Sequence, residues 1–331
     1  MNASRVSLGL PALDLRVRLE GMESGEIQHH LGFLGPRLSA PAAGDSPHIR
    51  IETLETGMRH ELSVLEPMDE VRCARGRRRI VCFPDGCHHY RIDTLSAVVR
   101  RAGVGYGIAL KAALLRAFAL QGVIAVHALA FEHAGLGYLV LGDSGSGKST
   151  LAAAVLLGGG RIVSDDLVLF GLGREGRATA MPYRADLVLR EPAYRRYRQE
   201  LADVGVEAMP LRVGEERKWR IARAVHPGYF VEATAIDVVL VLSKPGDCPN
   251  SRMRRVSQAA VGTGLMRENY FLSLPHPLEQ RAILGCFPRL LAGVSGLRVV
   301  LGRDLLKCPR TGFVRIVQAV ARACSKAGSS V

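Results

Sequence analysis

An α/β fold preceded by a small β-rich domain is predicted by three observations in this sequence. The stretch Gly142–Thr150 reads GDSGSGKST, a glycine-rich loop with a lysine and a serine near its end. The apolar run Tyr138–Leu141 before it is typical of a strand, and the alanine- and leucine-rich run Leu151–Leu157 after it is typical of a helix. Short runs of alternating character, separated by Gly, Pro and Asp turns, occupy much of the N-terminal part. We therefore expect a β-rich domain over residues 1–94, an α/β domain over 95–320 and a flexible tail over 321–331.

Composition places the chain among soluble globular proteins. It has 331 residues, of which 48% are hydrophobic and 23% charged, as is ordinary for one large domain or two smaller ones. The longest candidate membrane span, Ala112–Phe131, is interrupted by Arg116, Gln121 and His127. The N-terminus has no basic start followed by an apolar block, so we predict no secretory signal. The expected location is the cytoplasm.

The charge of the chain narrows the class of partner. Its formal net charge is +13 and its pI is about 9.8, which predicts an anionic partner such as ATP, an acidic peptide or nucleic acid. Aromatic residues make up only 5% of the chain, whereas surfaces that bind nucleic acid usually carry aromatic side chains among the basic ones. Nucleic acid is therefore the least favoured of the three.

The cysteines indicate reduced thiols. There are seven of them, without a secretory signal, which argues against a disulfide framework. Cys82, Cys87, His88 and His89 could suggest a zinc site, but their spacing fits no common site well. A plain hairpin is the favoured interpretation.

Before the glycine loop, the sequence predicts strands, one long helix and a hairpin. The predicted N-terminal strands are HIRIETLE, ELSVLEP, EVRCARG, RRRIVCF and HHYRID. A helix is expected from Asp93 or Thr94 to Gly122, weakened or divided by glycines in its first half. The run IAVHALAFEH then predicts a strand, and AGLG a tight turn into the strand that feeds the loop.

Beyond the loop, strands and helices alternate. The expected strands are RIVSDDLVLF, DLVLRE, AIDVVLVL and LRVVLGRD, and the expected helices are SQAAVGTGLMRENYF and TGFVRIVQAVARAC.

The glycine stretch has the full spacing of a phosphate loop: Gly142, four residues, then Gly147, Lys148 and Ser149. In such a loop, backbone N–H groups and the positive end of the following helix bind phosphates. We expect Lys148 to lie against the β- and γ-phosphates of ATP, and the Ser149 hydroxyl to ligate Mg²⁺. The residues predicted to bind ATP are Gly142, Asp143, Ser144, Gly145, Ser146, Gly147, Lys148, Ser149 and Thr150.

An acidic pair and a histidine are further candidates. Asp165 and Asp166 interrupt an apolar strand shortly after the loop, and adjacent carboxylates on a strand point to opposite faces. One can face the Mg²⁺ and phosphates while the other sits differently, or one can ligate the metal through water while its neighbour acts as a base. His127 is expected on a strand paired beside the loop, where a lone histidine is more often a packed core residue.

The block Val126–Phe170 resembles the HPr kinase/phosphorylase family and related HPr-kinase-like bacterial proteins. In that family, a strand histidine precedes a hairpin into the phosphate loop, and a glycine-bearing turn after the next helix leads to a strand carrying Asp-Asp. The residues on those positions are His127, Lys148, Ser149, Asp165 and Asp166. A weaker likeness, matched at Arg190 and Asn269, continues to about Phe271.

The resemblance implies a P-loop kinase core of the HPr kinase C-terminal type, with ATP and Mg²⁺ as cofactors and a serine of a protein or peptide as acceptor. It implies that Asp165 is the base, that His127 helps to position it, and that Asp166 with Ser149 holds the metal. We expect Arg190, or an arginine from the segment Arg217–Arg223, to stabilise the transition state. The family also suggests an oligomer.

One departure from the family bears on the acceptor. The family's enzyme has a metal-binding glutamate in a Leu-Glu-Ile-Arg-Gly context, where this chain reads LVLRE, so the acid is missing or displaced to Glu191. The departure argues against phosphorylase activity and against HPr itself as the substrate. The closer analogy is with HPr-kinase-like proteins of peptide-modifying gene clusters, including lasso-peptide systems, whose substrate is a precursor-peptide serine.

Two other functions stay open at the level of sequence. One is a small-molecule kinase on the same core, and the other is a nucleotide-binding regulatory module without its own acceptor. The Asp-Asp pair favours a transferase over a regulatory module. The acceptor, the nucleotide preference, the oligomeric state and the division of roles between Asp165 and Asp166 are left open.

Overall fold

The chain forms two compact units. The structure, a computed structural model, describes residues 5–13, 15–20, 38–39, 49–53, 78–83, 86–87, 114–115, 118–119, 121–184, 186–213, 216–269 and 277–325. The first unit comprises residues 1–124 and 273–286, and the second comprises residues 125–272 and 287–331. The division therefore falls at Ile124, whereas the sequence suggested a boundary near residue 94.

The first unit contains a six-stranded sheet in the order β3-β1-β2-β4-β5-β6. The strands are β1 (Arg5–Leu10), β2 (Leu15–Glu20), β3 (Leu38–Ser39), β4 (Ile49–Thr53), β5 (Arg78–Phe83) and β6 (Gly86–Cys87). The strands β1 and β2 form an antiparallel hairpin around the short helix η1 (Pro11–Leu13), and β4 runs parallel to β2 and β5. The described residues of this N-terminal part are mostly in strands.

Several predictions for the first unit fall on residues outside the described ones. The predicted strands ELSVLEP, EVRCARG and HHYRID lie outside the described residues, as does most of the predicted helix that ends at Gly122. Gly122 itself takes a φ of +79° in a turn after residues 118–119, which are helical. Cys82 of β5 lies opposite Cys87 of β6 in an antiparallel strand pair, as the hairpin interpretation predicted.

The second unit is built on a six-stranded sheet in the order β10-β8-β9-β17-β19-β18. The strands are β8 (Leu129–His133), β9 (Leu136–Leu141), β10 (Arg161–Ser164), β17 (Val238–Leu242), β18 (Arg252–Arg255) and β19 (Ser295–Val300). The central strands β9, β17 and β19 run parallel, and the outer ones pair antiparallel. Ligand sites in such sheets lie beyond the carboxyl ends of the parallel strands, and β9 ends at the glycine loop.

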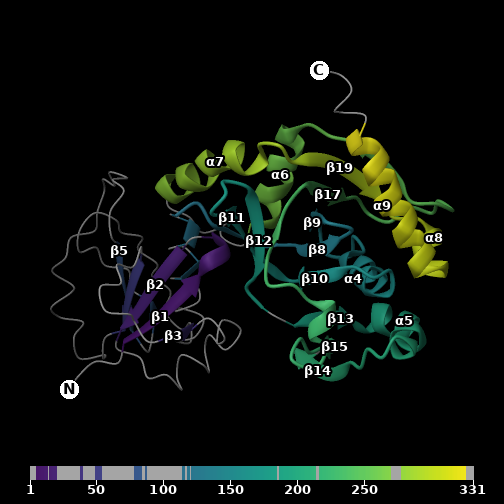
Figure 1. The fold of residues 1–331 in the computed structure, drawn as a ribbon, viewed down its shortest axis with the longest axis horizontal. Helices are drawn as coiled ribbons and strands as arrows, with labels where there is room; N and C mark the ends of the chain where they lie inside the picture. Colours follow the sequence, from purple (N-terminus) through teal and green to yellow (C-terminus); the bar gives the residue numbers. More distant parts are fainter. Residues whose placement is uncertain are drawn as a thin grey trace. The chain divides into compact units, whose positions relative to one another are not determined.

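Two smaller sheets complete this unit. A four-stranded sheet has the order β16-β12-β11-β7, and a three-stranded sheet the order β13-β15-β14. Their strands are β7 (Ile124–His127), β11 (Leu167–Leu172), β12 (Ala178–Pro182), β13 (Leu187–Arg190), β14 (Met209–Val213), β15 (Glu216–Ile221) and β16 (Thr234–Ala235). Figure 1 shows β11 and β12 running across the direction of β8 and β9.

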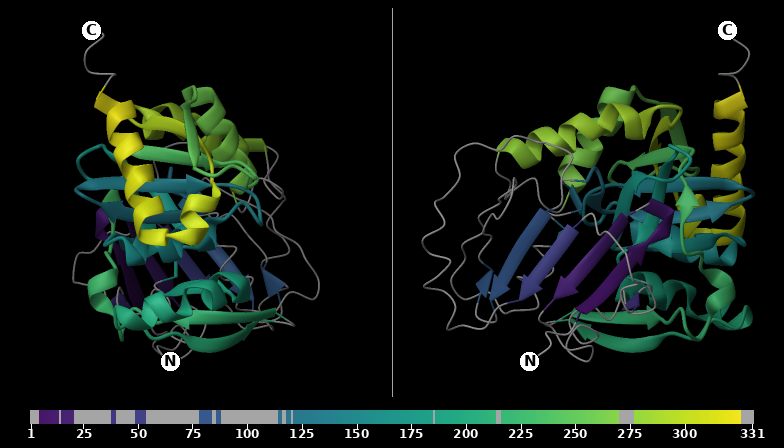
Figure 2. Two further views of the ribbon diagram at one scale, coloured as in Figure 1. Left: turned by 90° about the vertical axis from the view of Figure 1, so that its right-hand side faces the viewer. Right: turned by 60° about the vertical axis from the view of Figure 1, so that its left-hand side comes forward.

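Helices α4 (Lys148–Leu157) and α9 (Pro309–Ser325) lie on one face of the six-stranded sheet, and α6 (Gln258–Glu268) lies on the other. The other helices are α5 (Glu191–Asp203), which packs on α4, β13 and β15, α8 (Arg303–Lys307), which packs on α4 and α9, α7 (Pro277–Leu291, in the first unit up to Cys286) and the short helix η4 (Pro227–Tyr229). Val238, Leu240 and Leu242 of β17 share a core with α4 and α9. Val241 points to the opposite face, where α6 packs closely at Gly264. Figure 2 shows α6 and α9 on opposite sides of these strands.

Two runs that the sequence predicted as continuous strands are each divided between two sheets. The run IAVHALAFEH breaks at Ala128 into β7 and β8, and RIVSDDLVLF breaks at Asp165 and Asp166 into β10 and β11. We call these two places, at Ala128 and at Asp165–Asp166, the strand crossings, because the chain passes there from one sheet to another. The N–H of Ala128 donates a hydrogen bond to the carbonyl of Asp166 at 3.1 Å, so the two strand crossings lie side by side. The aspartates therefore lie in a bend rather than within a strand. His127 is on β7 beside β11, not on a strand paired with β9, because the chain changes sheet directly after it.

The other predicted elements of the second unit are confirmed. Strands β13 and β17 and helix α6 lie within the predicted runs, whereas β19 begins two residues before its predicted run and α9 extends beyond both ends of its own. Helix α9 continues to Ser325, so the first residues of the predicted tail, 321–325, are helical. Within the part of the chain that the structure describes, every helix is too short or too polar to cross a bilayer.

Phe313 of α9 provides a test of this packing. Its ring is fully buried between Phe131 and His133 of β8, at centroid distances of 5.8 and 4.9 Å. Replacing it with alanine leaves a cavity, so Phe313→Ala should lower the free energy of unfolding of the second unit by about 3–5 kcal/mol. Urea unfolding followed by the fluorescence of Trp219, the single tryptophan, measures this change.

Val314→Ala is the matched control, because Val314 is the next residue on α9 and is 37% exposed. It should change the free energy of unfolding by no more than about 0.5 kcal/mol. A loss below about 1 kcal/mol for Phe313→Ala would contradict the described packing of α9.

Candidate active site

The glycine loop joins the end of β9 to the start of α4, as the sequence predicted. Gly147 has a φ of +100° directly before Lys148, the first residue of α4, and a Cβ there would lie 2.6 Å from Leu301 Cδ1. A Cβ on Gly142 would lie 2.7 Å from Ser146 Oγ. Both positions therefore require glycine. The result is a loop that curves tightly before the N-terminus of a ten-residue helix, the local geometry that binds phosphate.

A pocket of about 350 Å³ opens at this loop. Its wall comes from the loop and the start of α4, from the two strand crossings, and from β13, β14, β15 and the start of α5. The lining residues are His127, Asp143, Ser144, Gly145, Gly147, Lys148, Ser149, Thr150, Asp165, Asp166, Arg184, Val188, Arg190, Pro192, Ala193, Leu211 and Lys218. The predicted site residues thus line one pocket, apart from Gly142 and the buried Ser146.

Lys148 is the buried cation of the pocket. Only 9% of its side chain is exposed, and its Nζ donates a hydrogen bond to the carbonyl of Gly142. Glu268 Oε2 lies 4.0 Å from the same Nζ. Burial lowers the pKa of Lys148 below its ordinary value, and the carboxylates of Glu268 and Asp143 oppose this effect. An ammonium group in this position gains from a nearby anion.

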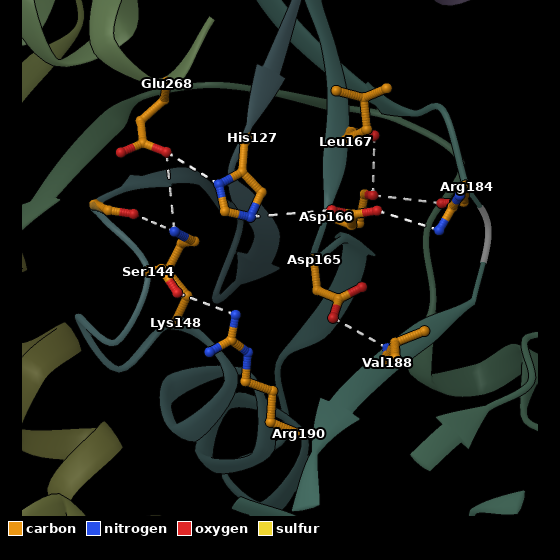
Figure 3. A network of polar contacts seen from close by, with 12 residues as sticks. His127, Ser144, Lys148, Asp165, Asp166, Leu167, Arg184, Val188, Arg190 and Glu268 are labelled. Carbon is orange, nitrogen blue, oxygen red and sulfur yellow. Dashed lines mark hydrogen bonds and ion pairs between the residues drawn. The ribbon is translucent and has the colours of Figure 1, made fainter. Parts of the chain in front are cut away.

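Asp165 lies in the bend between β10 and β11, with one oxygen of its carboxyl group, Oδ1, out of contact with water. Its Oδ2 accepts a hydrogen bond from the N–H of Val188 at 3.0 Å, whereas its buried Oδ1 has no hydrogen-bond partner among the described residues (Figure 3). Burial raises the pKa of Asp165 to about 8, an effect that the Val188 N–H opposes. A carboxyl group with such a pKa can exchange a proton near neutral pH.

Asp166 has a different environment. Its side chain is 48% exposed, its Oδ2 accepts a hydrogen bond from Arg184 Nη1 at 3.3 Å, and its Oδ1 lies 4.0 Å from His127 Nε2. Figure 3 shows His127 pointing toward Asp166. The expected pairing of His127 with Asp165 is therefore replaced by one with Asp166, because the bend turns the two carboxylates in different directions.

The end of α6 contributes two residues that sequence reasoning missed. Arg267 Nη2 donates to both carboxylate oxygens of Asp143, each at 2.8 Å. Glu268 Oε2 lies 3.1 Å from His127 Nδ1. The sequence predicted this helix, but no local signal indicated that it ends at the phosphate loop, more than a hundred residues earlier in the chain.

The candidate arginines divide into two groups. Arg190 lines the pocket, and its Nη2 donates to Ser144 Oγ at 3.1 Å. The arginines at 217, 220 and 223 do not line it, and each lies near an acid outside it. Arg190 is thus the arginine of the predicted set that lies at the site.

Glu191 does not replace the glutamate of the resembled family. Its carboxylate accepts hydrogen bonds from Trp219 Nε1 and Arg195 Nε, each at 2.6 Å, and it is absent from the wall of the pocket. The hydrogen bond from Trp219 contributes most to lowering the pKa of Glu191 below its ordinary value. Its oxygens are therefore engaged in holding β15 and the first turn of α5.

The residues predicted for Mg²⁺ fit that ion. Ser149 and Asp166 both line the pocket, and their oxygens are the hard ligands that Mg²⁺ prefers. Among the described residues, no three His, Cys, Asp or Glu side chains converge as a metal cage. In proteins, Mg²⁺ is commonly held by one or two carboxylates together with water and substrate phosphates.

Comparison with known proteins gives a weak structural likeness. No family model matches the chain, and no curated protein matches its sequence. Among solved structures, the chain is similar to the HPr(Ser) kinase/phosphatase from Coxiella burnetii, with 16% identity and a TM-score of 0.32 over 60% of this chain and 98% of that one. A likeness at this level carries no argument about function, so membership of that family stays a prediction.

The buried Asp165 predicts an unusual dependence of stability on pH. The native state keeps the Asp165 proton up to about pH 8, whereas the unfolded chain releases it near pH 4. The native state therefore binds more protons within this window, and this residue makes stability fall as the pH rises through it. Asp165→Asn should remove the fall, raising the free energy of unfolding by up to about 5 kcal/mol at pH 8 and by little at pH 4.

Urea unfolding at about pH 4.5, 6 and 8 measures the difference. Asp166→Asn is the matched control, because Asp166 is the adjacent carboxylate in the same bend and its side chain is half exposed. A difference between Asp165→Asn and the parent protein that does not grow with pH would contradict the buried, protonated state of Asp165.

Proposed function

We propose that this protein is an ATP-dependent phosphotransferase that transfers the γ-phosphoryl group to a serine hydroxyl of a protein or peptide. One observation carries the proposal: a complete phosphate loop with a buried lysine shares a pocket with two carboxylates, one buried and one half exposed. A loop alone would support nucleotide binding. The two carboxylates in different environments supply what a transfer reaction also needs, a base and a metal ligand.

The nucleotide end of the mechanism uses the loop and α4. The N–H groups of the loop and of the first turn of α4 hold the phosphates, and Lys148 turns from the carbonyl of Gly142 to the β- and γ-phosphates. Ser149 and Asp166 would hold Mg²⁺, which when bound neutralises charge on the phosphates. Arg190, which contacts Ser144 in the loop, adds a second cation beside the transferring group.

The acceptor end uses Asp165. In the fraction of molecules in which Asp165 is ionised, its unpaired Oδ1 accepts the proton of the serine hydroxyl while the serine oxygen bonds to the γ-phosphorus and the bond to ADP breaks. Burial favours this role, because a base with a pKa near 8 binds the proton more strongly than an ordinary aspartate. Arg184 donates a hydrogen bond to the neighbouring carboxylate, Asp166, at 3.3 Å.

A protein or peptide acceptor is supported by charge and by the likeness of the sequence block. Arg184, Arg190 and Lys218 line the pocket in addition to Lys148, and the chain as a whole carries +13. A basic wall favours an acceptor segment with acidic residues near the serine. The precursor peptides of peptide-modifying gene clusters are the first class to test.

The experiment is phosphate transfer from ATP and Mg²⁺ to candidate peptides encoded near this gene, read by mass spectrometry. We expect a mass gain of one phosphate on a serine, lost when that serine is replaced by alanine. Lys148→Ala and Asp165→Asn should each lower the transfer rate by about 10²-fold or more, because one removes a phosphate contact and the other the base. Lys307→Ala, which changes an exposed lysine of α8 outside the pocket, is the matched control and should leave the rate unchanged.

Other outcomes separate the alternatives. Transfer to a small molecule with no labelled peptide would make this a metabolite kinase on the same core. Tight nucleotide binding without any transfer, unaffected by Asp165→Asn, would indicate a nucleotide-binding regulatory module and contradict the proposal.

A further inference from the structure

Glu268 has an unusual position for a glutamate. It is the last residue of α6, where the negative end of the helix dipole disfavours a carboxylate. Its side chain is only 9% exposed, so its charge is also largely out of water. Neither the helix end nor the burial stabilises a carboxylate at this position. The contacts that the carboxylate makes must therefore explain why a glutamate is found there.

The contacts of Glu268 lead to two residues of the pocket. Its Oε2 lies 3.1 Å from His127 Nδ1 and 4.0 Å from Lys148 Nζ. Both His127 and Lys148 line the pocket, whereas Glu268 does not. Glu268 therefore reaches a bound substrate only through these two side chains. Figure 3 shows the Glu268 carboxylate joined by dashed lines to both His127 and Lys148.

The backbone fixes this arrangement. Val126 and Asn269 form an isolated antiparallel bridge, which places the residues next to them, His127 and Glu268, beside each other. The neighbouring Arg267 holds Asp143 of the phosphate loop with two hydrogen bonds. The end of α6 is thus anchored at β7 and at the loop, and Glu268 lies between these anchors.

The contact determines the proton arrangement on His127. An ionised carboxylate only accepts hydrogen bonds, so Nδ1 must carry a proton to bond with Glu268. The ring is then oriented with Nε2 toward Asp166 Oδ1, at 4.0 Å. The carboxylate of Glu268, the imidazole of His127 and the carboxylate of Asp166 thus form a row that leads from the end of α6 to the pocket.

We infer that Glu268 is a positioning residue for the phosphotransferase reaction, holding His127 toward Asp166 and keeping Lys148 in place until phosphates bind. The predicted effect of Glu268 on kcat rests on the proposed function, whereas its predicted effect on the proton arrangement of His127 does not. Glu268 does not contact the reacting atoms. It sets the direction of His127 and competes with phosphate for Lys148.

The first test measures kcat and the affinity for Mg-ATP separately in variants of Glu268. Glu268→Gln keeps the size of the side chain but removes its charge, so kcat for peptide phosphorylation should fall about 10- to 100-fold. The Kd for Mg-ATP should not rise, because Glu268 competes with the phosphates for Lys148 and the variant removes this competing charge. Glu268→Asp, which keeps the charge with a shorter reach, should retain more activity than Glu268→Gln. Glu175→Gln, in an exposed turn, is the matched control and should change neither value.

The second readout is the tautomer of His127, measured by ¹⁵N NMR and assigned by its absence in His127→Ala. The parent protein should show the proton on Nδ1, and Glu268→Ala should lose this preference. This measurement needs no acceptor, so it decides the role of Glu268 even if no peptide is phosphorylated and the proposed function fails.

Three results would overturn the inference. The first is a kcat for Glu268→Gln within twofold of the parent value. The second is a loss of kcat and Mg-ATP affinity by the same factor together with a lower melting temperature, which marks a purely structural role. The third is a His127 tautomer that is the same in the parent protein and in Glu268→Ala.

Discussion

The pocket depends on one backbone hydrogen bond, from the N–H of Ala128 to the carbonyl of Asp166. It joins the two places where the chain leaves one sheet for another. A strand that changes sheet must bend, and the bend releases its side chains from strict alternation between faces. Here the two bends place His127, Asp165 and Asp166 at the mouth of the loop that follows β9. The rigid sheets on either side then hold these residues without a long flexible connection.

The electrostatics of the pocket follow from unequal burial. Lys148 and Glu268 are almost fully covered, Asp165 has one oxygen out of reach of any described donor, and Asp166 is half exposed. Burial moves the pKa of Asp165 up and that of Lys148 down, so both groups are nearer to their neutral forms than the same groups in water. Such a set of charges costs stability in the empty protein and is relieved by an anion and a proton donor. That is the physical reason to regard the pocket as a site of reaction rather than as part of the core.

The sequence predicted the local features well and the long-range ones poorly. The phosphate loop, its flanking strand and helix, and the importance of the Asp165–Asp166 pair could be predicted, because each is encoded within a few neighbouring residues. The division of two strands at Ala128 and at the aspartates could not, because an apolar run has the same appearance whether it lies in one sheet or two. The pairing of His127 with Asp166 follows from that division. Glu268 and Arg267 reach the loop only through the packing of α6 on β9 and β17, and no local pattern indicates such a contact.

The central claim is that the loop at Gly142–Thr150 binds the phosphates of ATP through Lys148. Isothermal titration calorimetry of Mg-ATP with the parent protein and with Lys148→Ala tests it most directly, since it requires no knowledge of the acceptor. The account predicts saturable one-site binding that weakens by about 100-fold in the variant, or about 2.7 kcal/mol. Absence of binding to the parent protein, or equal affinity in the two proteins, would contradict it.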